Sequence, residues 1–514
     1  MPQDGSRIAA SPNAPVDAVV IGGGPSGSAV ARLLALWGHN VVVLAGGRSR
    51  RPGLAESLPP SCRKPFTLLG VLDAVESAGF VETRGNTSSW GGGPLRNIPF
   101  EGCGSGYQVR RRHLDDLLLG CAESAGAAVL REAVATDVEL PSGLGQLGSV
   151  RWRFRGQEAS VNARWILDAS GRAGVVARMG FRKAGSGAST LALVGTFAQP
   201  KGWALEDESH TLVESYEDGW AWSVPTGGDS RYVAAMVDPR LSSLSRGAGI
   251  ERMYLAELAK TTHLRRILKG ARRIDPAWAC CASPYGAHQH SADGVLLLGD
   301  AGSFLDPLSS FGVKKALASG WLGAVAVHTA LTKPKMTGAA RSLFEERERE
   351  AHMRYQDLAG HYYSEAAGFH DHPYWRVRSP LADPRSSSLD EDGAADSERL
   401  LRDPRVPAAF NFLRGDTPLR LRAAESVRRE WRPTVQGREV VLEEHLIAPS
   451  LPGGIHTIRG VRLPRLMDIV DQHEQVPDLY EAFAQTGPQV QLPDFLCALS
   501  ALLATGVVES GATH

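Results

Sequence analysis

Three glycines near the start of the chain, Gly22, Gly24 and Gly27, have the G-x-G-x-x-G spacing of a phosphate-binding turn. An apolar run at residues 18–21 precedes them, and a helical pattern and a second apolar run at residues 40–44 follow, which predicts a β-α-β unit. The first glycine makes the tight turn, the second lets a pyrophosphate approach the backbone, and the third lets the helix pack on the strand. The amides and dipole at the helix start attract phosphate, so we expect a dinucleotide to bind here.

The end of the second apolar run departs from the usual pattern. Dinucleotide-binding folds commonly place Asp or Glu there to bind the ribose hydroxyls, whereas this chain has Ala45, followed by Gly46, Gly47 and Arg48. A hydrogen bond to a charged group, worth about 1.5 to 3 kcal/mol, is therefore absent or supplied from elsewhere. We expect the nucleotide to be lost more easily on dialysis than is usual for this fold.

Two later apolar runs also end in acidic residues. Residues 164–172 include Asp168, and residues 295–306 end at Asp306; ligands of open α/β sheets bind at such carboxyl ends of strands. A helical segment follows Pro307 and starts near Gly312 and Val313. Its positive dipole end is expected to point at an anionic ligand.

Composition narrows the class of protein. The 514 residues include 56 Lys plus Arg and 56 Asp plus Glu, so no basic surface for nucleic acid is expected. Six cysteines form no C-x-x-C pair and no His stands at ligand spacing, so we expect no metal site and free thiols in a reducing compartment. Residues 1–17 lack the apolar run of a signal peptide, and no apolar stretch reaches the roughly 20 residues of a membrane span. The expected location is the cytoplasm.

Seven motifs in order carry a resemblance. They are GGGPSG, AESLPP, SSWGGG, GYQVRRRHLDDLLL, DASGR, GWAWSVP and GDAGSFLDPLSSFGV. Over residues 15–360 the set resembles the flavin-dependent halogenases of the phenol and pyrrole type. It equally resembles their non-halogenating relatives in the hydroxybenzoate-hydroxylase-like superfamily of flavoprotein monooxygenases, including those that mature tryptophylquinone cofactors. The resemblance implies FAD as the cofactor.

The resemblance also implies a set of cofactor-binding residues: Gly22, Gly24, Gly27, Gln108, Arg111, Asp300, Pro307, Gly312 and Val313. The glycines of the turn would hold the pyrophosphate, and Gln108 and Arg111 would line the flavin or its phosphates. Asp300 would bind the ribityl chain. The segment from Pro307 would lie against the isoalloxazine ring, where the helix start stabilises negative charge.

The expected fold class is α/β with three parts. Residues 1–190 and 280–365 form a Rossmann-like FAD-binding domain of the hydroxybenzoate-hydroxylase-like type, and residues 60–105 contribute to its substrate side. An alternating pattern at residues 191–279 predicts an inserted β-sheet substrate domain. A segment rich in Ser, Pro and acidic residues, 379–398, predicts a linker. Residues 366–514 are expected to form the third part. Three helical stretches after the linker predict a small helical or winged-helix-like domain there.

Halogenases of this family use a lysine that intercepts hypohalous acid. In the phenol-type pattern that position is Thr83 here. Lys64 lies eight residues after Glu56, a spacing similar to that of the catalytic lysine region of tryptophan halogenases, so Lys64 is a candidate catalytic residue. The favoured interpretation of Lys64 is nevertheless a solvated helix residue beside Arg63. Phe311, in front of Gly312, would crowd a halide where the family prefers small residues.

Trp220 and Trp222 alternate along one predicted strand. They are candidate catalytic residues by the resemblance, and otherwise a packed pocket wall, because each buries a large apolar area. The motif therefore locates a pocket and leaves the reaction open. The glycine turn and the segment from Pro307 to Val313 should border one ring-sized gap beside these tryptophans.

The favoured function is an FAD-dependent monooxygenase that hydroxylates an electron-rich aromatic ring through a C4a-hydroperoxyflavin. The favoured substrate is a tryptophan of a peptide or protein, as in tryptophylquinone biogenesis. Electrons would come from a separate flavin reductase or from NAD(P)H, because only one dinucleotide pattern is present. The alternatives are a halogenase of an aromatic substrate, a flavin-dependent reductase of isoprenoid double bonds, and a flavin-binding protein without activity.

Overall fold

The structure is a computed structural model. It describes residues 14–46, 53–100, 102, 104–143, 145–182, 188–242, 249–379, 396–415, 419–485, 487 and 489–511. By contacts the chain divides into two units, Met1–Ser387 and Ser388–His514. This division lies after the expected boundary at residue 366, which falls inside α8 (Thr337–Ala367). Most of the expected linker lies outside the described residues.

A largely parallel sheet forms one part of the first unit. Its strands, in spatial order, are β19 (Ser291–Ala292), β20 (Val295–Leu297), β11 (Gln157–Asp168), β1 (Val16–Ile21), β2 (Val41–Ala45) and β8 (Ala128–Arg131). β1 pairs in parallel with both β11 and β2, and β2 pairs in parallel with β8. β9 (Val134–Glu139) and β10 (Gly148–Phe154) extend β11 as an antiparallel edge. The carboxyl ends of β1, β2 and β11 meet at one edge, where ligands of such sheets bind.

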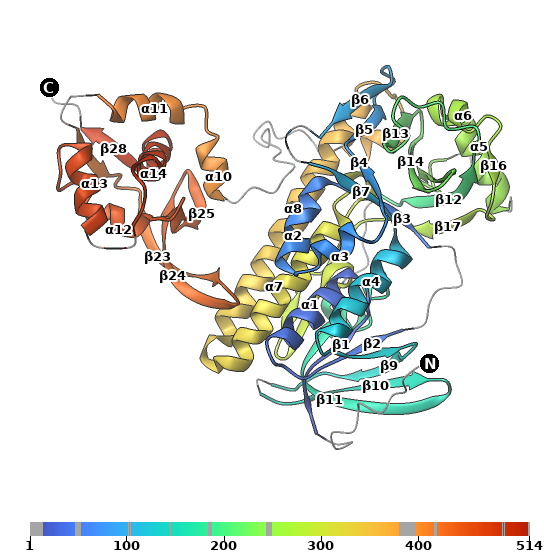
Figure 1. The fold of residues 1–514 in the computed structure, drawn as a ribbon, viewed down its shortest axis with the longest axis horizontal. Helices are drawn as coiled ribbons and strands as arrows, with labels where there is room; N and C mark the ends of the chain where they lie inside the picture. The colour runs from blue at the N-terminus through green and yellow to red at the C-terminus, as the bar shows by residue number, and fades with distance from the viewer. Residues whose placement is uncertain are drawn as a thin grey trace. The chain divides into compact units, whose positions relative to one another are not determined.

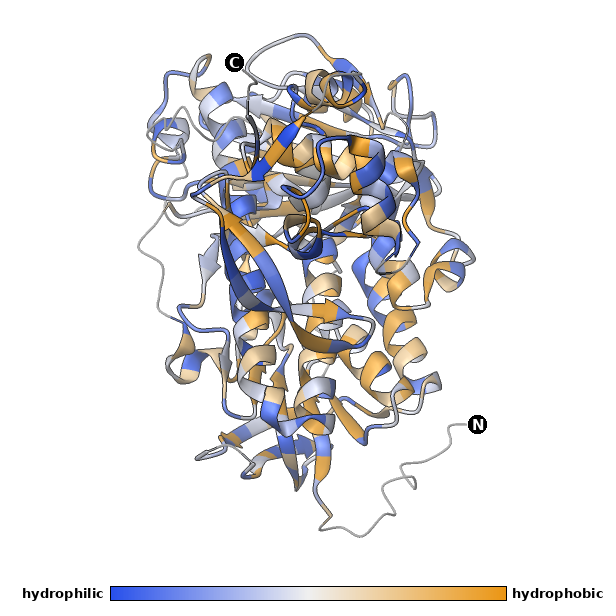
Figure 2. Cartoon of the chain, turned by 90° about the vertical axis from the view of Figure 1, so that its left-hand side faces the viewer, coloured by the Kyte–Doolittle hydropathy of each residue, from blue (hydrophilic) through white to orange (hydrophobic). Residues whose placement is uncertain are grey.

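Helices cover this sheet. The predicted β-α-β unit is confirmed, since α1 (Pro25–Leu36) joins β1 to β2. α1 packs against α4 (Arg111–Ser124) and α7 (Gly312–Thr332), which run beside it in Figure 1. A Cβ on Gly320 of α7 would lie 2.5 Å from the Ser26 carbonyl, so glycine lets these two helices touch. Figure 2 shows hydrophobic and hydrophilic bands alternating along the helices, as expected where one face meets the core.

A second, largely antiparallel sheet forms the other end of this unit (Figure 1). It contains β12 (Leu191–Ala198), β13 (Thr211–Tyr216), β14 (Gly219–Gly227), β15 (Ser230–Val237), β16 (Arg272–Arg273) and β17 (Trp278–Cys281). β5 (Gly85–Ser89) and β6 (Arg96–Pro99) join it from the earlier part of the chain. One face packs on α5 (Ile250–Lys260) and α6 (His263–Ile267) through a core that includes Tyr254 and Leu264. Residues 191–279 thus supply most of the strands of this sheet.

The remaining elements of the first unit connect the two sheets. β3 (Ala55–Leu58), β7 (Gly106–Arg110) and β4 (Val81–Thr83) form a small sheet, with α2 (Arg63–Leu68) and α3 (Leu72–Glu76) beside them in sequence. α8 packs on α7, and α9 (Pro373–Arg376) packs on α8. Trp375 of α9 is fully buried against Trp90 and Tyr363, with ring centroids 5.6 and 6.0 Å away.

The second unit has its own core. Its helices are α10 (Asp396–Leu401), α11 (Val406–Leu413), α12 (Leu463–Met467), α13 (Val476–Gln485) and α14 (Leu492–Ala504). β23 (Arg428–Gln436), β24 (Glu439–Ala448) and β25 (Leu451–Ile455) form a sheet, and β22 (Arg420–Ala423) pairs with β28 (Val508–Gly511). Phe495, Leu446 and Leu466 are fully buried in the core. In the part of the chain that the structure describes, no helix is long and apolar enough to cross a membrane.

Candidate active site

The glycine turn between β1 and α1 has the geometry that its spacing predicts. Gly22 has φ +114°, and a Cβ there would collide with the Ala169 carbonyl. A Cβ on Gly27 would collide with the Gly22 carbonyl, so this glycine serves close packing of helix and strand. A Cβ on Gly24 would instead project into open space, and Gly24 lines a cavity. Gly24 also precedes α1 without a side-chain cap, so the helix amides are open to a phosphate.

One cavity of about 570 Å³ joins the segments that the sequence singles out. The predicted site residues that line it are Gly22, Gly24, Arg111, Trp220, Trp222, Asp300, Pro307, Gly312 and Val313. The glycine turn and the start of α7 therefore border the same space, and the two tryptophans of β14 form part of its wall. This is the arrangement expected for a dinucleotide whose flavin end reaches an aromatic pocket.

Three predicted site residues lie outside the cavity lining. Gly27 lies in the first turn of α1, in the packing role described above. Gln108 on β7 is buried, and its Nε2 donates to the Ser209 carbonyl and the Thr211 hydroxyl at 3.1 and 3.0 Å. Lys64 lies exposed on α2. Lys64 is thus not among the residues that line the cavity, where most of the other candidates lie.

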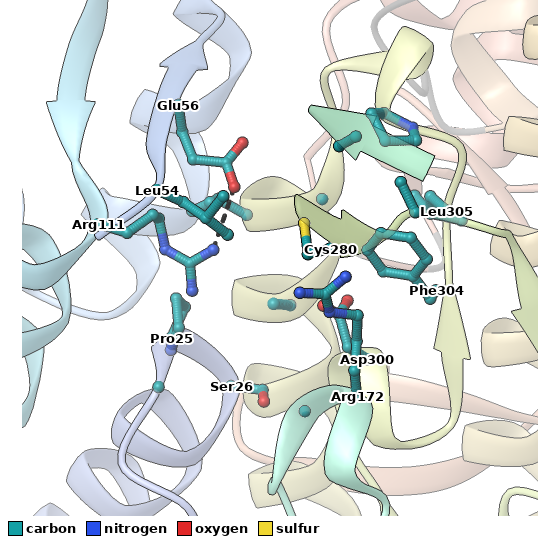
Figure 3. Close-up of a pocket in the computed structure, with 18 of the residues that line it drawn as sticks. Pro25, Ser26, Leu54, Glu56, Arg111, Arg172, Cys280, Asp300, Phe304 and Leu305 are labelled. Atoms are coloured by element: carbon teal, nitrogen blue, oxygen red, sulfur yellow. Dashed lines mark hydrogen bonds and ion pairs between the residues drawn. The ribbon is translucent and has the colours of Figure 1, made fainter. Parts of the chain in front are cut away.

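Arg111 lies beside Glu56 at the cavity edge (Figure 3) and forms ion pairs with Glu56 and Asp115. Its Nη1 lies 3.1 Å from Glu56 Oε1, and its Nε lies 3.2 Å from Asp115 Oδ1. Burial raises the pKa of Glu56, against the opposing effect of Arg111. Burial lowers the pKa of Arg111, but Asp115 and Glu56 outweigh it and raise that pKa overall. Glu56 was not among the predicted site residues, although it belongs to the AESLPP motif.

Asp300 lies across the cavity from Arg111, beside Arg172 and Phe304 (Figure 3). Burial raises the pKa of its carboxyl, while Lys315, Arg111 and Arg172 lower it. The Arg172 guanidinium lies 5.4 Å from the Phe304 ring centroid and donates to the Cys281 carbonyl. The DASGR motif could have identified Arg172 as a site residue.

A buried lysine supports the segment that carries Asp300. Lys315 of α7 is 3% exposed, and its Nζ donates to the Gly299 and Ser303 carbonyls, each at 2.7 Å. Its charge is balanced by the buried carboxylate of Glu348 on α8, 3.5 Å away. Lys315 therefore ties both ends of the Asp300 turn to α7.

The start of α7 faces the cavity with open amides. Phe311 at the N-cap gives no side-chain cap, and a Cβ on Gly312 would meet nothing within 4 Å. Ser310 has φ +56°, a left-handed conformation that costs a non-glycine residue about 1 kcal/mol or more. Phe311 is buried, with its ring centroid 5.0 Å from that of Tyr355. The helix start therefore presents its positive dipole end to the cavity beside Pro307.

A carboxyl lies next to this helix start. Asp306 lines the cavity, and its Oδ1 accepts from the Leu308 amide at 3.0 Å. Its Oδ2 accepts from the Tyr363 hydroxyl at 3.0 Å. Burial raises the pKa of Asp306, against both hydrogen bonds. This pair can hold a proton at the cavity wall.

The aromatic end of the cavity is formed by β14 and β15. Trp220 is 2% exposed, and Trp222 packs against Tyr232 with 5.6 Å between ring centroids. Trp90 lies edge-on to Trp220 at 6.4 Å. Small side chains of β12 and β15, Ala192 and Ala234 among them, line the cavity beside these rings and leave it room. The pocket is therefore apolar, rigid and suited to a flat aromatic ring.

These features fit FAD. The glycine turn opens toward a pyrophosphate, Asp300 can accept from a hydroxylated chain, and the α7 start lies where a flavin ring would reach the tryptophans. Among the described residues, no group of three or more His, Cys, Asp or Glu side chains is placed to hold a metal ion.

A family model described as tryptophan halogenase matches residues 93–395, more than half of the chain. The chain belongs to the tryptophan halogenase family. This membership confirms the predicted superfamily and its α/β fold. Curated relatives include a tryptophan 2-halogenase of Chondromyces crocatus, 28% identical over 60% of this chain and 60% of its own length. The flavin-dependent halogenase armH4 of Armillaria mellea is 28% identical over 61% of this chain and 65% of its own length. The chain thus matches under two thirds of the length of either relative.

Solved structures extend the comparison. The flavin-dependent halogenase CmlS aligns with 97% of this chain and 96% of its own, with a TM-score of 0.78 and 23% identity. The peptidyl tryptophan dihydroxylase QhpG aligns with 96% of this chain and all of its own, with a TM-score of 0.68 and 20% identity. The chondrochloren halogenase CndH covers 71% of this chain and 86% of its own, with a TM-score of 0.64 and 29% identity. The first two share the fold over nearly the whole chain, although one is a halogenase and the other a dihydroxylase.

Proposed function

We propose that this protein is an FAD-dependent oxidoreductase that hydroxylates an electron-rich aromatic ring. The observation that carries the proposal is the single cavity in which the glycine turn, the α7 start and the tryptophans of β14 meet. The first two features suit a flavin dinucleotide, and the third suits an aromatic substrate beside the flavin ring.

FAD, when bound, supplies the redox and oxygen chemistry, and the chain supplies position, charge and a dry cavity. Gly24 and the open amides of α1 hold the pyrophosphate, and Asp300 accepts from the ribityl hydroxyls. The uncapped start of α7 stabilises negative charge on the ring side of the cavity. Asp306 and Tyr363 hold a proton within the same wall, available to a substrate that gains or loses one.

Three features favour hydroxylation over halogenation. Thr83 is fully buried, and its hydroxyl donates to the Gly85 carbonyl at 2.9 Å, so this position carries no amine. Lys64 is exposed on α2, apart from the cavity lining. Phe311 fills the space in front of Gly312 with a buried ring.

The proposed substrate is an indole within a peptide or protein. A pocket walled by Trp220, Trp222 and Tyr232 suits an indole ring, and QhpG, a structure with the same fold, is described as a peptidyl tryptophan dihydroxylase. Electrons would be delivered by a separate flavin reductase or by NAD(P)H that binds transiently.

Halogenation is the second candidate, because the family and its curated relatives carry halogenase names. Aerobic turnover with FAD, a reductant, bromide and either free or peptide-bound tryptophan separates the two by product mass. Addition of oxygen supports the proposal, and a bromine isotope pair in the product would overturn it. Turnover of free tryptophan alone would overturn the peptide substrate while leaving the hydroxylase intact.

The Lys64→Ala variant is the matched control in that assay. Because Lys64 is exposed on α2, the variant should fold normally, and hydroxylation should persist. A halogenase that depends on Lys64 would instead lose its halogenated product.

A further inference from the structure

The ribose end of the nucleotide site lacks its usual carboxylate on β2. β2 ends at Ala45, whose methyl group is buried, and Gly46 follows. An adenosine ribose at this edge of the sheet presents two hydroxyl donors, which a carboxylate binds best. The structure must therefore provide an acceptor from another element, or leave the sugar weakly held.

A second cavity of about 540 Å³ continues from the glycine turn past the end of β2. It shares Gly23, Gly24, Arg111 and Arg172 with the first cavity and is also lined by Ala45 and Gly46. Among the described residues, three carboxylates line it: Asp115, Asp116 and Glu132.

Strand register brings Glu132 beside the end of β2. β8 runs parallel to β2, and Ala45 pairs with Arg131, the last residue of β8. Glu132 is the next residue, so it leaves the sheet at the same edge as Gly46. The chain stays close after this point, because a Cβ on Gly46 would lie 3.7 Å from the Ala133 carbonyl.

The backbone at Glu132 is unusual for its residue type. Its φ of +64° lies in the left-handed region that glycine, Asn and Asp adopt more readily. This turn buries Ala133 completely while Glu132 lines the cavity mouth. Glu132 forms an ion pair with Arg155, whose Nε lies 3.9 Å from Oε2, and both side chains are mostly exposed. Such a pair is weak, so the carboxylate can accept from a ligand.

The other two carboxylates are worse placed for this role. Two guanidinium nitrogens of Arg111 already donate to the Asp115 carboxylate. Asp116 follows it on α4, whereas Glu132 follows the strand that is paired with β2. Glu132 is thus the carboxylate that stands where a residue at the end of β2 would reach.

We propose that Glu132 binds the ribose hydroxyls of the AMP half of FAD, in place of the acidic residue that Ala45 lacks. The proposal rests on the proposed use of FAD and concerns one named contact of that cofactor. It makes Glu132 a cofactor-binding residue with no part in the reaction at the flavin ring.

The test is equilibrium titration of the full-length apoprotein with FAD and, separately, with FMN, followed by flavin fluorescence. FMN lacks the AMP half. The Glu132→Gln and Glu132→Ala variants should bind FAD about tenfold or more weakly, as for loss of a hydrogen bond to a charged group, with FMN binding unchanged. Glu158→Gln, which alters an exposed carboxylate on β11, is the matched control and should bind both flavins normally.

A rescue variant makes the inference sharper. Ala45 lines the second cavity, so a glutamate there has room to reach the ribose, and Ala45→Glu combined with Glu132→Ala should restore FAD affinity. Unchanged FAD binding in Glu132→Ala overturns the inference, and so does an equal loss for FAD and FMN. Wild-type protein that binds FMN and FAD equally would also overturn it, because the AMP half would then contribute nothing. Wild-type protein that binds neither flavin would instead refute the proposed function itself.

Discussion

The buried pair of Lys315 and Glu348 offers a quantitative test of how the Asp300 turn is supported. Lys315→Met keeps most of the side-chain volume and removes the ammonium. The Glu348 carboxylate, itself 4% exposed, would then be buried without its cation. Loss of one partner of a buried ion pair costs about 3 to 5 kcal/mol, so we expect a loss of that size in the free energy of unfolding.

The double variant Lys315→Met/Glu348→Met should be more stable than Lys315→Met. It no longer buries a lone charge, and the remaining loss is that of two hydrogen bonds, from Lys315 Nζ to the Gly299 and Ser303 carbonyls, at about 1 kcal/mol each. We therefore expect the double variant to lie about 2 kcal/mol below wild type. FAD affinity should fall in both variants, because the Asp300 turn loses its tie to α7.

Urea unfolding followed by tryptophan fluorescence measures the free energy of unfolding of the unit that contains Lys315 and Glu348. Every tryptophan except Trp431 lies within Met1–Ser387, and Trp431 is 66% exposed, so the signal reports the first unit. A Lys315→Met variant that loses less than about 1 kcal/mol would refute the argument that the pair is electrostatically coupled. A double variant less stable than Lys315→Met would refute it as well.

Three further predictions concern the cavity and its surroundings. Gly24→Ala should weaken FAD binding at least tenfold with unchanged thermal stability, because its methyl group projects into the cavity. The control Gly338→Ala on α8, where a methyl group also meets open space, should leave FAD binding intact. Equal FAD affinities in titrations of the two variants would contradict this prediction. His352 has a pKa lowered to about 4 by burial, with help from nearby positive charge, so the unfolded chain takes up its proton first as the pH falls below 6.5. Between pH 7 and pH 4, the free energy of unfolding should therefore fall by about 2 kcal/mol more in wild type than in His352→Gln. Urea unfolding of both proteins at the two pH values measures this, and equal falls would count against burial of a neutral His352. Trp222→Leu should raise KM for the aromatic substrate about tenfold or more while the Kd for FAD stays within twofold, and a matching rise in both would mean that Trp222 contacts the cofactor.

The parts of the site that the sequence predicts best are those built from neighbouring residues. The spacing of Gly22, Gly24 and Gly27 fixes a turn, a helix start and a strand pair within a short stretch of chain, and all three are present. The helix start at Gly312 follows from a local pattern in the same way. Local steric rules suffice for most of these features, because Gly22 and Gly27 meet within one turn of chain; the contact of Gly22 with the distant Ala169 carbonyl is the exception.

Contacts between distant segments were not predictable in this way. Glu56 and Arg111 are 55 residues apart in the chain. They meet because Glu56 lies on β3, which pairs with β7, and Arg111 begins α4 directly after β7. Asp306 meets Tyr363 only because α8 folds back along α7. Lys64 shows the converse: a spacing from Glu56 suggested a catalytic position, but the helix that carries Lys64 leaves its side chain exposed.

The charges around the cavity bear on how a pyrophosphate would bind at the glycine turn. Arg111 is already bound to Glu56 and Asp115, and Arg172 donates to the Cys281 carbonyl and packs over Phe304. The charge of Arg111 is therefore already matched, whereas Arg172, whose hydrogen-bond partner is a neutral carbonyl, keeps its positive charge beside Asp300. For a pyrophosphate at the glycine turn, we expect the uncapped amides at the start of α1 to contribute much of the binding, and they can do so only if Gly24 leaves the approach open. On the proposed function, phosphate recognition would thus depend largely on the backbone of one short segment, while the side chains around it would position the rest of the cofactor.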